Sequence, residues 1–382
     1  KFPPPDGFQP LNTANTRPET VIARPDQYVG ITTWTGDGNT GRNIKTFQFK
    51  PDLVWIKQRS ATRAHALFDS VRGANKRLQS SSTNAETTHT DQMSAFIDNG
   101  FTVEDNNTVN VSSGTYVGWC WRAGGNKNTF NVDDVGYATA AAAGLNGGDL
   151  TVTGASVGTK QGFSIIKYTG SGNAGDSASH GLLEAPKFII TKNIDNGTYS
   201  WRVFTTAIDG SNDRLFLNAT SSKANQSGAP VPTSSVFYVD SNLDHNKLND
   251  NIIAYLWHDV PGLQKFGSYT GNGDTGDDGP FIELGFRPAI IWFKRTEDDG
   301  YNWNCYDTTR SNTGNPTNEV IRLNLTNTEE ANYGNGDIDV LANGFKIRNY
   351  WGNVNAANKS YIYCAWAEAP SIDLYGGGAN AR

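Results

Sequence analysis

Five short sequence blocks recur three times along the chain in the same order, and this recurrence constrains the fold more than any other feature. The opening block reads Trp-Thr-Gly-Asp-Gly-Asn-Thr-Gly at 34–41, and related glycine-rich octets stand at 168–175 and 269–276. A Pro-containing apolar block follows each octet, at 49–57, 185–192 and 286–294, and a block ending in Trp closes each copy at 116–121, 252–257 and 361–366. Two shorter blocks lie between them at 68–72 and 306–310 and at 99–101 and 343–345, and both are weaker in the middle copy. Such self-similarity predicts three tandem copies of one domain of about 100 residues.

The composition indicates that each copy consists of short strands joined by turns. The chain has 41 Gly, only 18% charged residues and 11% aromatic residues, so it has the material for cores but few helix formers. Residues 53–56 and 289–293 are continuous apolar runs preceded by Pro, which is typical of strands buried on both faces. We therefore predict an all-β protein of three tandem repeats with a β-sandwich or jelly-roll fold.

The copies divide the chain into six segments. We expect an extended N-terminal arm over residues 1–27, β repeats over 28–124, 161–262 and 263–370, a linker over 125–160 and a C-terminal tail over 371–382. The linker contains an alanine-rich stretch at 137–144 that favours a short helix. Because the first residue is Lys1, we expect either a processed chain or a piece of a longer protein.

Charge and cysteine content argue against several classes of protein. The net charge is −6 without a basic run, so we expect no nucleic-acid partner. No apolar run reaches eighteen residues, so we expect no membrane span. The three cysteines, Cys120, Cys305 and Cys364, form neither a disulfide framework nor a metal-ligand spacing, which indicates folding in a reducing compartment.

The glycine-rich octets invite two ligand interpretations, a dinucleotide and a cation. A dinucleotide fingerprint needs a following helix, whereas a Pro-opened strand follows here, so we reject it. Oxygens of Asp37, Asp274, Asp277 and Asp278 would suit calcium, although turn chemistry alone explains Asp at such positions. We expect plain turns and no cofactor, with calcium as the alternative.

An Asp and an Arg three residues apart recur in the first and third copies. They are Asp69 with Arg72 and Asp307 with Arg310, and the middle copy replaces both with Thr205 and Ile208. Joint loss is what a buried ion pair predicts, because an unpaired partner would be costly. A catalytic pair is the alternative, but no His or Ser recurs beside either pair, and the five histidines occupy unrelated positions. We expect structural ion pairs and no catalytic residue.

Aromatic residues inside polar loops are the binding candidates. Tyr301, Tyr350, Trp351 and Tyr199 each lie among Asn, Asp, Ser and Gly residues. Ring faces with amide and carboxylate neighbours are typical of sugar sites, and aromatic anchors dominate many protein interfaces. The neighbouring Trp201 and Trp303 align with each other, which fits a core position equally well.

The blocks together resemble a widespread family of structural repeat domains in marine bacteriophages. The first copy carries most of the family pattern, with Asp-Leu-Val-Trp-Ile-Lys at 52–57, Phe-Asp-Ser-Val-Arg-Gly at 68–73 and Tyr-Val-Gly-Trp-Cys-Trp at 116–121. The Pro-rich start at 3–12 is similar to the junction after a lectin-like domain in such phage proteins. The resemblance implies a virion component, folded in the host cytoplasm, and brings no catalytic residues.

These observations predict a binding protein and not an enzyme. We expect a tail-fibre or adhesin segment that contacts a host-surface glycan or protein. We also expect it to bind other virion proteins. A purely structural component, such as a capsid decoration or fibre shaft, is the alternative, and a glycan-cleaving tailspike is a third. Repeated weak sites suit avidity, so we also expect a homo-oligomer, with a trimer favoured.

Overall fold

The structure is a computed structural model that describes residues 22–311, 314–330, 336–372 and 378–379. The described chain is built almost wholly from β-strands, which confirms the predicted all-β class. The exceptions are a single 3-10 turn, η1 (Pro25–Gln27), and a one-turn helix, α2 (Leu243–Asn246). Within the described ranges no helix is long and apolar enough to cross a membrane. Most of the predicted N-terminal arm and C-terminal tail lies outside the described residues.

Three antiparallel sheets share one strand order, although they come from different parts of the chain. The first strand of each segment pairs with its last strand, which then pairs with the strand of the Pro-opened block. In the first segment the order is β1 (Val29–Thr35), β9 (Thr115–Trp121), β3 (Leu53–Gln58), β4 (Ala66–Asp69), β5 (Gly73–Leu78) and β6 (Thr87–Thr88). The second has β13 (Phe163–Thr169), β20 (Asn251–Trp257), β15 (Phe188–Asn193), β16 (Arg202–Thr205), β17 (Asp213–Phe216) and β18 (Ala224–Asn225). The third has β21 (Gln264–Thr270), β28 (Ser360–Ala367), β23 (Pro288–Arg295), β24 (Asn304–Asp307) and β25 (Ile321–Arg322). We call these three segments the first, second and third units.

A smaller sheet covers the outer face of each large sheet, so that each unit has two layers. The first unit uses β2 (Arg42–Lys45), β8 (Gly100–Val103) and β7 (Met93–Ile97), and the third uses β22 (Phe281–Glu283), β27 (Gly344–Ile347) and β26 (Ile338–Leu341). The second unit has only β14 (Ser177–Ser179) and β19 (Val236–Tyr238) in this place. Three separate apolar clusters fill the spaces between the layers. Because β3 and β23 lie between this outer cluster and the molecular centre, they are buried on both faces, as their sequences predict.

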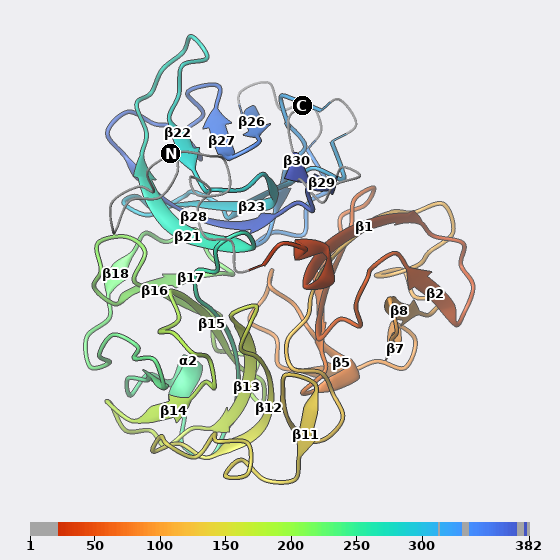
Figure 1. The fold of residues 1–382 in the computed structure, drawn as a ribbon, viewed down its shortest axis with the longest axis vertical. Helices are drawn as coiled ribbons and strands as arrows, with labels where there is room; N and C mark the ends of the chain where they lie inside the picture. The colour runs from red at the N-terminus through yellow and green to blue at the C-terminus, as the bar shows by residue number, and fades with distance from the viewer. Residues whose placement is uncertain (1–21, 312–313, 331–335, 373–377, 380–382) are drawn as a thin grey trace, which may run out of the picture.

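The inner faces of the three large sheets share one core at the centre of the molecule. Figure 1 shows the units as three lobes around this centre, coloured red to orange, yellow to green and cyan to blue. The closing Trp of each unit lies there, and the ring centroids of Trp121, Trp257 and Trp366 are 5.4–6.4 Å apart, with the ring planes steeply inclined. Such edge-to-face contacts suit the quadrupole of an indole ring. The three units are therefore one body around an approximate three-fold axis.

The segment between the first two copies differs from the predicted linker. It contains β10 (Phe130–Val132), β11 (Val135–Tyr137) and β12 (Val152–Gly158), which extend the sheet of the second unit. β12 pairs with the free edge of β13, and the second unit's large sheet thereby reaches nine strands. The alanine-rich stretch forms turns and not a helix. A two-stranded pair, β29 (Ser371–Ile372) with β30 (Gly378–Ala379), ends the described chain.

Candidate functional site

Each glycine-rich octet is held in place by a buried Asn, which gives these turns a structural role. The aromatic residue that opens the octet donates a hydrogen bond to the carbonyl just before that Asn; the pairs are Trp34 with Val109, Tyr168 with His245 and Tyr269 with Val354, at 2.7–3.0 Å. The next residue, Asn110, Asn246 or Asn355, is fully buried and hydrogen-bonds the turn that follows. The octets are therefore hydrogen-bonded to the loop that precedes the last strand of each unit and hold it in place.

The four Asp residues considered for calcium belong to these turns or to ion pairs. Asp37 accepts from Asn110 Nδ2 at 2.8 Å, and Asp274 accepts from the backbone of Gly276 and Asp278. Asp278 also pairs with Lys346 at 2.7 Å, and Asp277 lies 3.9 Å from Arg348. Within the described ranges no group of three or more His, Cys, Asp or Glu side chains is placed to hold a metal ion.

Both recurring Asp and Arg side chains form buried ion pairs. Arg72 Nε lies 2.5 Å from Asp69 Oδ2, Arg310 Nε lies 2.5 Å from Asp307 Oδ2, and all four side chains are at most 1% exposed. Each Asp also accepts two backbone N–H groups of its own turn, as the bonds of Asp69 Oδ1 show. The i, i+3 spacing thus closes a tight turn at the end of β4 and β24.

A contact between units explains why the middle copy lacks this pair. Asp69 of the first unit accepts a hydrogen bond from Tyr255 Oη of the second at 2.7 Å, and Asp307 of the third accepts one from Trp119 Nε1 of the first at 2.9 Å. The remaining boundary is that between the second and third units. The residue of the third unit that corresponds to Tyr255 and Trp119 is Cys364, whose thiol is a weak donor. There Thr205 replaces the Asp, and Ile208 packs against the central core. The Asp and Arg therefore occur only where the neighbouring unit offers a strong donor.

Two aromatic loops of the third unit lie side by side. The guanidinium of Arg295 stacks on the ring of Tyr301 at 3.9 Å and donates to the Gly352 carbonyl at 3.3 Å. Tyr350 in the second loop is 51% exposed, whereas Trp351 is partly buried against the core of the third unit. Three of the four predicted ring residues therefore belong to one surface. We call Tyr301, Asn302, Tyr350 and Asn353 the aromatic loop pair.

Amide hydrogen bonds fix this loop pair on the sheet. Asn302 N donates to Asn353 Oδ1 at 3.2 Å, and Asn324 Nδ2 donates to Asn302 Oδ1 at 2.7 Å. Tyr361 Oη donates to the Gly352 carbonyl at 2.8 Å, and burial raises the pKa of this phenol to about 12, so it stays protonated. The fourth candidate, Tyr199, lies apart in the second unit, where Lys247 Nζ is 5.8 Å from its ring centroid. Trp201 and Trp303 are fully buried core residues.

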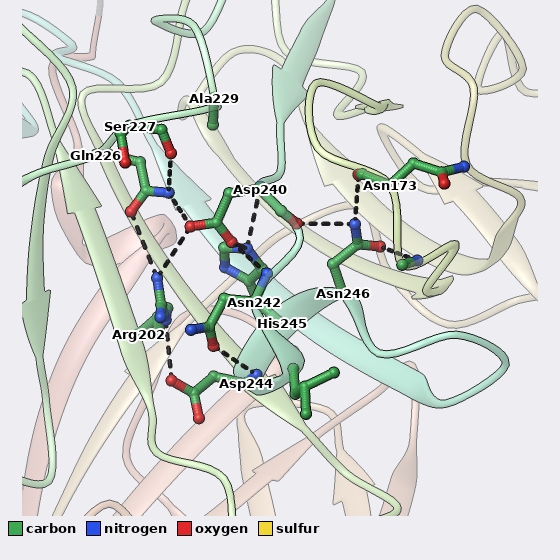
Figure 2. A network of polar contacts seen from close by, with 12 residues as sticks. Asn173, Arg202, Gln226, Ser227, Ala229, Asp240, Asn242, Asp244, His245 and Asn246 are labelled. Atoms are coloured by element: carbon green, nitrogen blue, oxygen red, sulfur yellow. Dashed lines mark hydrogen bonds and ion pairs between the residues drawn. The ribbon is translucent and has the colours of Figure 1, made fainter.

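The second unit carries a polar network that has no counterpart in the other two units. Figure 2 shows Arg202 between the carboxylates of Asp240 and Asp244, with Gln226 beside it. Arg202 is 1% exposed and reaches these groups from β16, where the other units have Ala66 and Asn304. His245 Nε2 lies 2.7 Å from Asp240 Oδ1. No sequence signal identified this network, because its members recur in no other copy.

Asp240 of this network also lines an open surface hollow of about 440 Å³. Its rim consists of small and polar residues together with the half-exposed Leu243; the lining residues are Ala174, Ser227, Gly228, Asp240, Ser241, Asn242 and Leu243. Burial alone would raise the pKa of Asp240, but the hydrogen bond and charge of His245 hold it below the ordinary value. Burial lowers the pKa of His245.

Three buried lysines stand at equivalent positions, one in each unit. Lys57, Lys192 and Lys294 end the Pro-opened blocks and are fully buried, and burial lowers the pKa of each to about 8. Their ammonium groups donate to backbone carbonyls, and two of them reach the neighbouring unit: Lys57 reaches Thr326 and Lys294 reaches Thr220, both at 3.3 Å. Their recurrence in the sequence is the signal that would have found them. Lys57 and Lys294 thus join neighbouring units, whereas Lys192 bonds the Asn196 and Tyr199 carbonyls of its own unit.

The comparisons with known proteins place this arrangement in a family. The model of a domain of unknown function, DUF7483, matches residues 24–370 in one stretch. The chain belongs to the DUF7483 family. The DUF7483 match spans all three units, which agrees with the central core that the three units share. No curated protein and no solved structure shows a detectable match to the chain.

Proposed function

We propose that this DUF7483 protein is a bacteriophage virion component, a tail-fibre or adhesin segment that binds a host-surface glycan through the aromatic loop pair of the third unit. The observation that carries this proposal is the position of Tyr301, stacked on Arg295, beside the loop that presents the half-exposed Tyr350. A ring held by a guanidinium loses little conformational entropy when a ligand binds against it. Neighbouring amides of Asn302 and Asn353 supply donors and acceptors for hydroxyl groups.

Among the described residues, only the third unit combines both aromatic loops, because the second unit has Tyr199 at the position of Tyr301 but Ser241 at the position of Tyr350. The three units of one chain therefore do not offer three equal sites. The first unit has Ala-Thr-Arg at 61–63 in the loop that corresponds to Tyr301. Avidity would therefore come from several chains in one assembly, which agrees with the expectation of a homo-oligomer.

A purely structural virion component is the second candidate. The observation that favours it is the closed set of contacts between units, in which Trp201, Trp303 and His65 each bond a carbonyl of a neighbouring unit at 2.8–3.1 Å. These contacts join all three units into one body.

Binding of the purified protein to host cells and to immobilised host glycans separates these candidates. We expect saturable binding that Tyr301→Ala with Tyr350→Ala abolishes, while Ser241→Trp, which fills the hollow of the second unit, leaves it intact. The reverse pattern would move the site to that hollow. Absence of binding by the parent protein would favour the structural component, and progressive shortening of the glycan would favour a glycan-cleaving tailspike.

A further inference from the structure

The first strand of each unit has an outer edge, which faces away from the last strand, and this edge is covered to a different extent in the three units. In the second unit, β12 covers the edge of β13 as an antiparallel partner, from Gly158 opposite Phe163 to Val152 opposite Tyr168. In the third unit the connection before β21 covers part of that edge, because Gln264 and Val260 exchange backbone hydrogen bonds and Phe266 N donates to Asp259 Oδ1. Proteins commonly protect sheet edges in such ways.

Among the described residues, none covers the edge of β1 in either of these ways. Tyr28 and Gly36 are bonded to the β9 side, through Arg122 and Gly114, so the alternation of an antiparallel pair turns the backbone groups of Val29, Ile31 and Thr33 away from β9. No hydrogen bond from the described residues reaches the N–H groups of these three. The edge borders a hollow of about 280 Å³, whose other side is the third unit.

This hollow is the counterpart of the space that β12 fills in the second unit. Its far wall includes Ala289, Thr308 and Thr309 of the third unit, which correspond in the repeat to Asp52, Ser70 and Val71 of the first. Those first-unit residues line β12: Ser156 Oγ bonds Asp52 Oδ1 at 3.2 Å, and a Cβ placed at Gly154 would lie 3.0 Å from Val71 Cγ1. The same cleft between neighbouring units is thus filled in one place and open in another.

We propose that the edge of β1 accepts an extended segment of a separate polypeptide, which adds to the sheet antiparallel to β1 as β12 adds to β13. Strand addition of this kind draws its affinity from backbone hydrogen bonds and its specificity from alternate side chains. The segment is about as long as β12, which has seven residues. This inference is independent of the glycan site, because the hollow lies between the first and third units and not on the aromatic loop pair.

The walls define the chemistry of the incoming segment. In the second unit, Ser156 of β12 bonds Asp52 on the facing wall, whereas the residue at that place in the wall of this hollow is Ala289. The residue of the incoming segment that corresponds to Ser156 therefore has no carboxylate opposite it and is best small and apolar. Gly124 lies against the backbone of Val157 in β12, and its counterpart in the third unit is Ala369. The methyl group of Ala369 therefore keeps the incoming segment slightly further from the wall than β12 is. Asp26 and Glu368 also line the hollow, but they are paired with Arg24 and Arg287, so an uncharged strand with small side chains fits these limits.

A labelled peptide that copies residues 150–160 with Ser156→Ala tests the proposal on the intact protein by fluorescence anisotropy. The matched control peptide has Pro at position 156, whose counterpart in the chain pairs with Ile165. We expect saturable binding of the first peptide and about tenfold weaker binding of the second, the effect of losing one net hydrogen bond. Deuterium exchange of the Ile31 amide should slow when the first peptide binds.

Variants of the protein locate the site. Thr33→Pro removes an edge N–H at an exposed position and leaves the pairing with β9, so the protein should fold and bind the peptide about tenfold more weakly. Thr309→Trp fills the hollow from the other wall and should block binding, although it leaves β1 unchanged. Equal binding of both peptides, no binding of either at millimolar concentration, or binding unaffected by both variants would overturn the proposal. Self-association in ultracentrifugation that Thr33→Pro abolishes would assign the edge to a second copy instead.

Discussion

Replacing Arg72 by Ile should destabilise the protein more than replacing both members of its ion pair. Arg72→Ile leaves the fully buried Asp69 without its cation, and breaking a buried pair on one side costs about 3–5 kcal/mol. Asp69→Thr with Arg72→Ile copies the residues of the second unit and removes both charges. One part of the remaining cost comes from the hydroxyl of Tyr255, which loses its acceptor, at about 1–3 kcal/mol. Adding Tyr255→Phe removes that orphaned donor and should recover part of this loss.

Urea unfolding followed by tryptophan fluorescence measures these differences, because the indoles of the central core change environment when the units separate. Arg24→Ile is the matched control, since Arg24 forms an exposed ion pair with Asp26 and should unfold like the parent protein. The reasoning fails if Arg72→Ile unfolds at the same urea concentration as the double variant, or at a higher one. A triple variant no more stable than the double variant would refute the role given to Tyr255.

Three further predictions concern groups inside the units. Burial lowers the pKa of His65 to about 3, below its value near 6.5 in the unfolded chain, so the free energy of unfolding should fall as pH drops from about 6.5 towards 4. His65→Gln should reduce that slope by up to about 1.4 kcal/mol per pH unit, measured by urea unfolding at each pH. The thiols of Cys120, Cys305 and Cys364 are buried with raised pKa values, so a thiol reagent should modify none in the folded protein and all three in denaturant; rapid modification in buffer would contradict the core placement. Asn110→Ala should cost about 1–3 kcal/mol, because it frees the turn at 34–41, whereas Asn39→Ala at the exposed tip should cost little in the same thermal scans.

Recurrence in the sequence was enough to predict the class of the fold and the position of its most buried residues. The closing Trp residues align in the three copies, and they meet at the centre of the molecule. The spacing of Asp69 and Arg72 also predicted a pair, because residues three apart can meet across one turn. Each of these signals lies within one copy, and comparison of the three copies makes it visible.

Contacts between units could not be predicted in the same way. Asp69 meets Tyr255 across 186 positions of sequence, and nothing in either block points to the other. The segment 152–158 lies outside the repeat, so its apolar alternation gave no indication that it would join the sheet of the second unit. Arg202 and Asp240 are single occurrences of common residues, and only folding brings β16 beside the loop after β19. The aromatic loop pair was found residue by residue, but its assembly from two loops 49 residues apart was not.

The differences among the three units argue that each has a fixed place around the axis. The first and second units meet through Asp69 and Tyr255, the third and first through Asp307 and Trp119, and the second and third through an apolar contact at Ile208. Exchanging two units would place a buried Asp opposite Cys364 or leave Tyr255 without its acceptor, at a cost similar to that of the one-sided variants above. This non-equivalence specifies one order of units. It also allows the surfaces of the units to diverge, and among the described residues the aromatic loop pair, the hollow lined by Asp240 and the uncovered edge of β1 each occur in a different unit.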